Sequence, residues 1–184
     1  MSAGPHYTRV FLTGFMGSGK STVGPILANS VGYDFVDLDA QIEAAEGRSI
    51  RDIFRSEGEA HFRALEREEI ARLCTRSRLV VALGGGTLVQ PETHRLIRAS
   101  GVLVYLKLSP DQLFQRVRRN EDRPLLSGPE GQHLTGPELK ERIAQLYRQR
   151  EELYASADII VESDARSVGV TVERIVRELR RHLV

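Results

Sequence analysis

The sequence predicts an α/β fold in which a mostly parallel, five-stranded sheet is flanked by helices. Three observations predict it. Short apolar segments alternate along the chain with longer segments of helical periodicity. The apolar segments are β-branched and lack polar alternation, which indicates strands buried on both faces and hence a parallel sheet. The first of them leads directly into the glycine-rich stretch GFMGSGKST, residues 14–22.

Each predicted strand is followed by at least one predicted helix. Strands are expected at residues 9–13, 33–39, 78–86, 101–108 and 157–163. Helices are expected at residues 20–31, 40–46, 49–76, 91–99, 110–119, 137–154 and 167–183. In the third helix Ser49 is the expected N-cap, and the apolar face carries Phe62, Leu65, Ile70 and Leu73. We expect one domain over residues 1–184.

Composition limits the class of protein. The 184 residues are 41% hydrophobic and 28% charged, an ordinary globular balance. Lys and Arg total 26 against 25 acidic residues, and this net charge of +1 offers no case for nucleic acid or an anionic membrane as partner. The single cysteine excludes an intramolecular disulfide and suits a reducing compartment. With no signal-peptide pattern and no apolar run near the ~18 residues that span a bilayer, we expect a cytoplasmic protein. We also expect a monomer, because nothing in the sequence demands a larger assembly.

The glycine-rich stretch fits the phosphate-binding pattern G-x-x-x-x-G-K-[ST], with Gly14, Gly19, Lys20 and Ser21 at the required spacing. Its backbone N–H groups and the following helix N-terminus favour an anion. Lys20 is expected to reach the β- and γ-phosphates of a nucleotide, and the Ser21 hydroxyl to ligate Mg²⁺. The alternative, a glycine-rich turn with an incidental lysine, fits poorly with its place between an apolar strand and a helix.

Magnesium usually needs a carboxylate as well, and the candidates are Asp37 and Asp39 at the end of the second predicted strand. Side chains two residues apart in an extended chain point to the same side, so we expect both carboxylates together. The alternative is that Asp39 only caps the next helix.

Three successive glycines, Gly84, Gly85 and Gly86, follow the third predicted strand. Ligands of open α/β sheets bind at the carboxyl ends of strands, and glycines leave backbone N–H groups open to close approach. A tight turn without a ligand is the alternative.

Two arginines suggest what the acceptor looks like. Arg150 occupies a position of its helix where the periodicity requires an apolar residue, so its charge needs a ligand or a buried ion pair. Arg63 flanks an apolar face, and its alternative role is an exposed pair with Glu59 or Glu66. Two arginines, an acid and open N–H groups suit a small molecule that bears a carboxylate and hydroxyls.

One stretch breaks the alternation of strands and helices. Residues 120–137, NEDRPLLSGPEGQHLTGP, show no periodicity. Arg116, Arg118, Arg119 and Arg123 precede or enter it, which favours a mobile lid at about residues 120–136 over a plain surface insertion.

Seven segments, in this order, resemble the motifs of the shikimate kinase family: GFMGSGKST, DLD (37–39), GRSIRDIF (47–54), EAHFRALE (59–66), ALGGG (82–86), RPLL (123–126) and RQREELY (148–154). The resemblance implies a three-layer P-loop kinase fold with a mobile lid and an acceptor-binding helical segment at about 37–66. It also implies ATP- and Mg²⁺-dependent phosphorylation of shikimate to shikimate 3-phosphate, a step in chorismate and aromatic amino acid biosynthesis.

The resemblance implies a role for each nucleotide-site residue. The ATP phosphates would bind to Gly17, Ser18, Gly19, Lys20, Ser21 and Thr22. Ser21 would hold Mg²⁺ directly and Asp37 through water. Arg116 would stack on adenine, and Arg123 in the lid would touch the transferring phosphate.

At the acceptor site, the resemblance implies that Asp39 orients or deprotonates the attacking hydroxyl, so the catalytic set would be Lys20, Asp39 and Arg123. Arg63 and Arg150 would bind the carboxylate of shikimate. The backbone of Gly85 and Gly86 would contact the acceptor, and its ring would lie against Phe54 and Phe62.

Other functions share the phosphate loop. A GTPase would need a guanine-reading N-K-x-D motif, which is absent. A nucleoside monophosphate kinase would need a base pocket, which two carboxylate-binding arginines do not explain. A nonenzymatic ATP-binding protein fits poorly with the lid motif and the acid. Gluconate kinase is the nearest alternative, because gluconate is also a polyhydroxy carboxylate.

Overall fold

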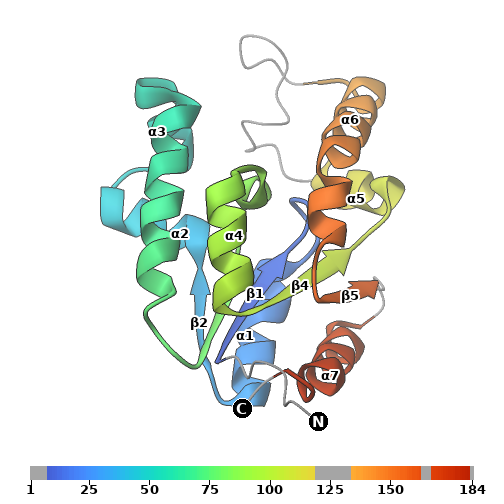
Figure 1. Cartoon of the computed structure of the whole chain (residues 1–184). Coiled ribbons are helices and arrows are strands. Elements are labelled where there is room, and N and C mark those ends of the chain that lie inside the picture. Colours follow the sequence, from blue (N-terminus) through green and yellow to red (C-terminus); the bar gives the residue numbers. More distant parts are fainter. Residues whose placement is uncertain (1–7, 119–133, 163–166, 183–184) are drawn as a thin grey trace.

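The computed structural model describes residues 8–118, 134–162 and 167–182. Five strands form one sheet in the order β2-β3-β1-β4-β5, and every neighbouring pair is parallel. The strands are β1 (Arg9–Thr13), β2 (Asp34–Asp37), β3 (Leu79–Ala82), β4 (Val102–Lys107) and β5 (Ile159–Glu162). The prediction of five strands in a parallel sheet is confirmed (Figure 1).

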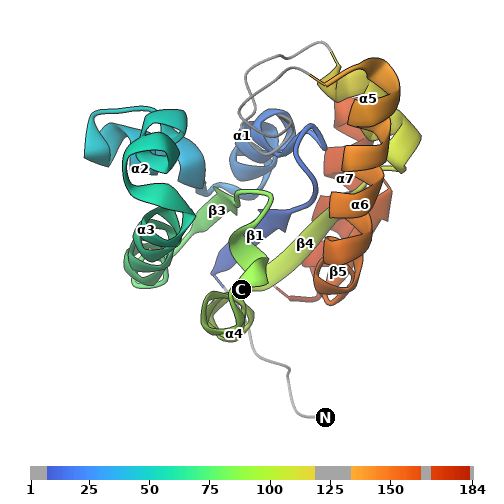
Figure 2. The ribbon, with the colours of Figure 1, turned by 90° about the horizontal axis from the view of Figure 1, so that it is seen from above.

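Helices cover both faces of the sheet and make three layers (Figures 1 and 2). One face packs against α2 (Leu38–Glu46), α3 (Ile50–Leu73), α4 (Pro91–Ser100), α5 (Pro110–Val117) and α6 (Gly136–Ala155). The other face packs against α1 (Lys20–Val31) and α7 (Val168–Leu179). A short 3-10 helix, η1 (Thr87–Val89), follows the glycines and was not predicted.

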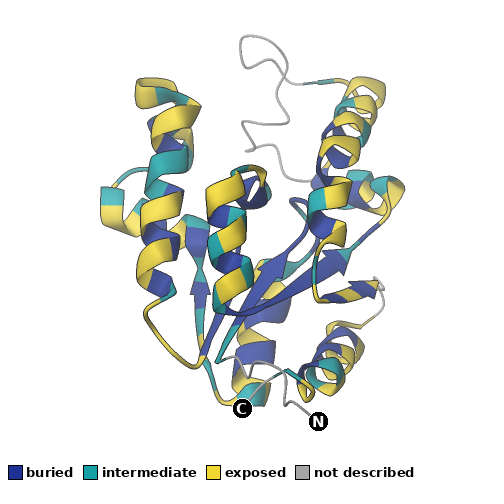
Figure 3. Cartoon of the chain, in the orientation of Figure 1, coloured by how far each residue is buried: buried dark blue, intermediate teal, exposed yellow. Residues whose placement is uncertain are grey.

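Burial separates the central strands from the edge strands (Figure 3). All residues of β3 are buried, as are all but one in β1 and in β4. The side chains of β5 alternate between buried and exposed, and Ile160 is 48% exposed. In β2 only Val36 is buried. The prediction of strands buried on both faces is therefore wrong for both edge strands, β2 and β5, because an edge strand can present side chains to solvent without a regular polar alternation.

The second predicted strand ends earlier than expected. β2 stops at Asp37, and α2 begins at Leu38. Asp37 is the N-cap of that helix, since its Oδ1 accepts from the N–H groups of Asp39 (3.2 Å) and Ala40 (3.4 Å). Asp37 and Asp39 therefore do not share one face of a strand, and the geometry predicted for them is wrong. The capping residue is Asp37 rather than Asp39.

Helix α3 follows its predicted pattern. The Ser49 side chain accepts from the N–H of Asp52 (3.1 Å), which confirms the N-cap. The helix bends at Gly58, where φ is 83°. Of the predicted apolar face, Phe62, Ile70 and Leu73 are buried and Leu65 is partly buried.

The topology brings three loops to one edge. Because β1 lies between β3 and β4 and all strands are parallel, their carboxyl ends meet there. The phosphate loop follows β1, the glycines follow β3, and Asp37 ends β2. The predicted lid, residues 120–136, lies outside the described residues except at 134–136, and Arg119 and Arg123 lie outside them too. In the described ranges no helix is long and apolar enough to cross a membrane.

Candidate active site

The phosphate loop has the backbone that its glycines permit. Gly14, Gly17 and Gly19 have positive φ values of 143°, 81° and 99°. A Cβ at Gly14 would lie 2.7 Å from the carbonyl oxygen of Leu106, so no larger residue fits. Lys20 Nζ donates to the carbonyl oxygens of Gly14 (2.8 Å) and Phe15 (3.1 Å). The lysine therefore lies over the loop into which a phosphate would fit.

Two oxygen groups suited to magnesium meet beside this loop. The Ser21 hydroxyl donates to Asp37 Oδ2 at 2.7 Å. Hydroxyl and carboxylate oxygens are the ligands that Mg²⁺ prefers, and Mg²⁺ commonly uses one or two protein groups with phosphates and water completing its shell. Among the described residues no group of three or more His, Cys, Asp or Glu side chains is arranged so that it could hold a metal ion. The chemistry of Ser21 and Asp37 thus fits a magnesium ion shared with a nucleotide.

Arg116 approaches the loop from α5. Its Nη1 donates to the carbonyl oxygens of Gly17 (3.3 Å) and Ser18 (3.4 Å). Its guanidinium therefore lies at the phosphate loop, and the stacking on adenine that the resemblance implied stays a prediction.

The described part of the chain leaves one oxygen of the Asp39 carboxylate without a hydrogen-bond donor. Its Oδ1 is buried and has no hydrogen-bond partner there. Burial, followed by the nearby charges of Glu66 and Asp37, raises the pKa of Asp39 to about 6, and Lys20 opposes the shift. An unpartnered buried oxygen costs free energy unless a ligand donates to it.

Each of the three glycines after β3 lies against one predicted acceptor residue. A Cβ at Gly84 would lie 2.9 Å from Asp39 Oδ1. A Cβ at Gly85 would lie 3.8 Å from Arg150 Nη1, and one at Gly86 only 2.5 Å from Arg63 Nη2. This loop therefore brings together the following residues: Asp39, Arg63, Gly85, Gly86 and Arg150.

Arg63 forms both of the ion pairs that were considered for it. Its side chain pairs with Glu59 (2.9 Å) and with Glu66, and it lies over the Phe62 ring with Cζ 5.3 Å from the centroid. The arginine side chain is only 12% exposed, so the pairs do not lie on an open surface. Phe62 also packs against Phe54, with ring centroids 5.0 Å apart.

Arg150 is buried, as its place in the helical pattern predicted. It is 7% exposed, and its Nη1 donates to the carbonyl oxygen of Gly85 at 3.2 Å. In the described ranges no carboxylate pairs with it, so the alternative of a buried ion pair finds no partner there. A guanidinium has five donors, which leaves donors for an anionic ligand.

Two site residues escaped the sequence analysis as functional groups. Glu66 is 1% exposed and accepts from the Thr87 hydroxyl at 2.7 Å while it pairs with Arg63. Glu66 stands four residues after Phe62 and four before Ile70, so the rule that singled out Arg150 could have found it. Tyr154 donates its hydroxyl proton to the Gly85 carbonyl at 2.6 Å. No sequence signal separates it from an ordinary core tyrosine.

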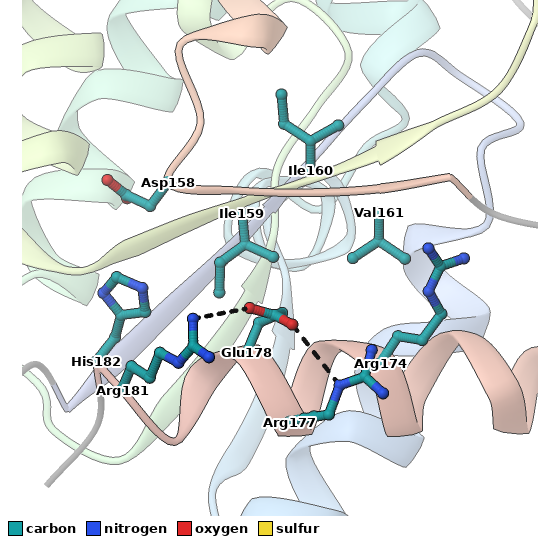
Figure 4. Close-up of a pocket in the computed structure, with 9 residues that line it drawn as sticks. All are labelled: Asp158, Ile159, Ile160, Val161, Arg174, Arg177, Glu178, Arg181 and His182. Carbon is teal, nitrogen blue, oxygen red and sulfur yellow. Dashed lines mark ion pairs between the residues drawn. The ribbon is translucent and has the colours of Figure 1, made fainter.

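A groove of about 310 Å³ lies elsewhere, between β5 and α7 (Figure 4). Its charged side chains include Arg174, Arg177, Glu178 and Arg181, and Glu178 pairs with the last two of these arginines. None of the predicted site residues lines it. We therefore do not assign the active site to this groove.

Similarity to known proteins agrees with this geometry. The family model described as Shikimate kinase matches residues 16–180. A shikimate kinase of Chlorobaculum tepidum is 47% identical over 178 residues, which cover 97% of this chain and 93% of that protein. The solved shikimate kinase of Acinetobacter baumannii in complex with shikimate is 31% identical, with a TM-score of 0.86 over 95% of this chain and 93% of that one.

A gluconokinase of Sinorhizobium meliloti is more distant. It is 20% identical, with a TM-score of 0.57 over 98% of this chain and 94% of that one, and it shows a shared fold alone. The family model, the close relative and the arrangement at the glycine loop lead to one conclusion. The chain belongs to the shikimate kinase family.

Proposed function

We propose that the chain transfers the γ-phosphoryl group of ATP to a ring hydroxyl of shikimate and releases shikimate 3-phosphate and ADP, in the biosynthesis of chorismate and aromatic amino acids. The observation that carries the proposal is the glycine loop, where Asp39, Arg150 and Arg63 each lie against one of three successive glycines. One acid and two guanidinium groups match an acceptor that bears hydroxyls and a carboxylate.

The nucleotide would bind along the phosphate loop. Backbone N–H groups of the loop and the N-terminus of α1 would receive the phosphates, and Lys20 would exchange its loop carbonyls for phosphate oxygens. Arg116 would contribute from the rim of the loop. The role of Arg123, which lies outside the described residues, is inferred from the family resemblance.

Magnesium is part of the proposal. Ser21 and Asp37 would hold the ion, directly and through water respectively, because their oxygens meet at 2.7 Å beside the loop. When bound, Mg²⁺ supplies neutralisation of the charge on the phosphate oxygens.

Asp39 would orient the acceptor hydroxyl and accept its proton. As the hydroxyl oxygen bonds to the γ-phosphorus, the bond from that phosphorus to the β,γ-bridging oxygen breaks, and ADP leaves. Phosphoryl transfer depends mainly on positioning and on stabilisation of charge, so a buried carboxylate oxygen without a partner suits the first task. The pKa of Asp39, about 6, lies nearer to neutral pH than that of an ordinary aspartate. A general base works best when its pKa is near the pH of the reaction.

ADP release with different acceptors tests the assignment. ATP and Mg²⁺ should give rapid release with shikimate and background release with gluconate, AMP or no acceptor, and withholding Mg²⁺ should abolish the shikimate-dependent part. Equal release with and without shikimate would overturn the assignment. Preferential use of gluconate would instead establish the sugar-acid alternative.

Two further properties are proposed from the sequence. The balanced charge and the absence of any feature that requires a partner favour a monomer. Because ATP is the phosphoryl donor and the single cysteine suits a reducing compartment, we place the enzyme in the cytoplasm.

A further inference from the structure

The Gly85 carbonyl oxygen accepts two side-chain hydrogen bonds from one helix. Tyr154 Oη donates to it at 2.6 Å, and Arg150 Nη1 donates at 3.2 Å. These residues are one helical turn apart in α6, on the face that lies against the core, and both are buried. The two donors together fill both lone pairs of this carbonyl oxygen.

This arrangement matters because the loop has little stiffness of its own. Three successive glycines have no side chains that restrict their backbone, so an outside contact has to select one conformation. The peptide between Gly85 and Gly86 is planar and trans, so the Gly86 N–H points away from the Gly85 carbonyl. Holding the carbonyl oxygen therefore also fixes the direction of the Gly86 N–H. Across the described residues no acceptor is found for that N–H group, which leaves it open to a ligand.

Tyr154 is well placed to act as such an anchor. It is 1% exposed, and its ring packs against Tyr105 with centroids 5.2 Å apart. Burial is the main cause that raises the pKa of Tyr154 to about 12, so the hydroxyl keeps its proton at neutral pH and remains a donor. Tyr147, on the same helix, differs in one respect. Its hydroxyl meets the Tyr105 hydroxyl at 3.1 Å and not the loop.

We infer that Tyr154 is a positioning residue, which holds the Gly85 carbonyl so that the Gly86 N–H and the Arg150 guanidinium are directed at the acceptor's carboxylate. Tyr154 itself does not touch the acceptor. The inference rests on the proposed function, because it assumes that the glycine loop and Arg150 bind that carboxylate.

Tyr154→Phe and Tyr147→Phe form a matched pair that tests the inference. Each removes one buried hydroxyl from α6 and keeps the ring, so both should lower the melting temperature to a similar extent. Only Tyr154→Phe should raise the KM for shikimate, by about tenfold, while the KM for ATP and kcat change less than threefold. Replacing Tyr154 with p-aminophenylalanine, which restores a donor at the ring's para position, should recover most of the loss.

A carboxamide analogue of shikimate separates positioning from general damage. The KM values for this analogue should differ by less than twofold between Tyr154→Phe and the wild-type enzyme, because the analogue lacks the carboxylate that the loop binds. Equal KM values for shikimate in the two tyrosine variants would overturn the inference. So would a KM for ATP that rises in parallel. If Tyr154→Phe does not fold, the variant with p-aminophenylalanine at position 154 is compared with Tyr147→Phe instead. Because that variant keeps a donor at the para position, a folded protein whose KM for shikimate is raised tenfold would contradict the role of Tyr154 as an anchor. Failure of the proposed function is distinguishable, because the wild-type enzyme would then show no shikimate-dependent ADP release.

Discussion

Arg150 brings a charge into the interior at a position that the helix reserves for an apolar side chain. The guanidinium is 7% exposed, and a backbone carbonyl is the acceptor that the described residues provide for it. Burying a charge without an ionic partner is costly, and the cost is offset when an anion binds. A buried arginine without an ionic partner in the described residues is therefore a candidate to bind an anionic ligand.

Arg150→Ala should therefore weaken acceptor use far more than it weakens the fold. Removing one partner of a buried charge pair costs ~2–5 kcal/mol, or roughly thirty-fold to several thousand-fold in kcat/KM with shikimate varied. Arg150→Lys should recover little, because an ammonium group cannot reproduce the planar fork. The KM for ATP should stay near the wild-type value.

The control is Arg148→Ala, which removes an exposed arginine of α6 that pairs with Glu141. Steady-state kinetics with each substrate varied in turn should show no defect for it, because exposed ion pairs contribute little. If Arg150→Ala only lowers the melting temperature and leaves shikimate kinetics intact, Arg150 is a structural residue.

Asp39→Asn should lower activity without lowering stability. The carboxylate lies near Glu66 and Asp37, and its Oδ1 lacks a partner in the described ranges, so removing its charge relieves repulsion. We expect kcat to fall by more than tenfold, about 1.4 kcal/mol in the barrier, with the KM for ATP nearly unchanged. Chemical denaturation should give an equal or higher free energy of unfolding.

Asp34→Asn, an exposed substitution at the start of β2, is the comparison for Asp39→Asn. It should leave both kcat and stability near wild type. A parallel loss of kcat and stability in Asp39→Asn would mean that Asp39 supports the helix rather than the reaction.

At the residue scale, functional residues could be predicted where they break the apolar periodicity of a helix, and were missed where they fit it. Arg150 stood out because a charge occupied an apolar position. Tyr154 did not, because a buried aromatic residue in an apolar position is ordinary. Its hydroxyl meets Gly85, which is 69 residues away in the chain, and no local pattern reports such a contact. The prediction for the two aspartates failed because the N-cap at Asp37 ended the strand early.

At the element scale, periodicity predicted several helix boundaries closely. Both boundaries of α1 are as predicted, and each boundary of α4 and α6 lies within one residue of its predicted position. The 3-10 helix η1 was missed because its three residues are too few to show a helical period. The roles of Gly84 and Gly86 can be inferred only from their neighbours in space, since a Cβ at either would lie within 3.0 Å of a side chain from another element, whereas one at Gly85 would make ordinary contacts at 3.5 Å or more.

Gly86→Ala should disturb the acceptor site without breaking the loop. The backbone at Gly86 has φ −111° and ψ 0°, a conformation with negative φ that alanine can also adopt. The added Cβ would lie 2.5 Å from Arg63 Nη2, so the end of that flexible side chain has to move. We expect the KM for shikimate to rise at least fivefold, because displacing one charged contact costs about 1 kcal/mol.

Gly169→Ala is the control at the element scale, because among the described residues its Cβ would meet Ser167 Oγ at 3.6 Å, an ordinary van der Waals contact. In the first turn of α7, away from the glycine loop, it should leave the kinetics unchanged and raise the melting temperature slightly. An unchanged KM for shikimate in Gly86→Ala would show that Arg63 does not bind the acceptor in its present position.

At the scale of the whole molecule, the alternation of strands and helices was enough to predict the three layers. The strand order β2-β3-β1-β4-β5 was not predicted, because pairings such as β1 with β4 join segments about ninety residues apart. That order nevertheless decides where the site forms, since it places the phosphate loop between the ends of β3 and β4.

The two hydrophobic clusters share this single sheet, which has consequences for unfolding. Phe11 of β1 points into one cluster, while its neighbours Val10 and Leu12 point into the other. Neither cluster can lose its strands without exposing the opposite one. We therefore propose that the chain unfolds as one domain, in one calorimetric transition whose van't Hoff and calorimetric enthalpies agree.

Ligands should shift that one transition in a pattern that reports both the domain and the acceptor. At a shikimate concentration one hundred times its Kd, binding adds about 2.7 kcal/mol to stability. For a chain of this size that corresponds to a rise of roughly 5–11 °C in the melting temperature. Gluconate at the same concentration should give no rise.

Arg150→Ala should lose the shift by shikimate and keep the shift by a non-hydrolysable ATP analogue, because the arginine lies at the glycine loop and not at the phosphate loop. Two separate transitions, of which shikimate moves only one, would contradict the single domain. A shift by shikimate that survives in Arg150→Ala would contradict the role of the arginine, because the carboxylate would then be held elsewhere.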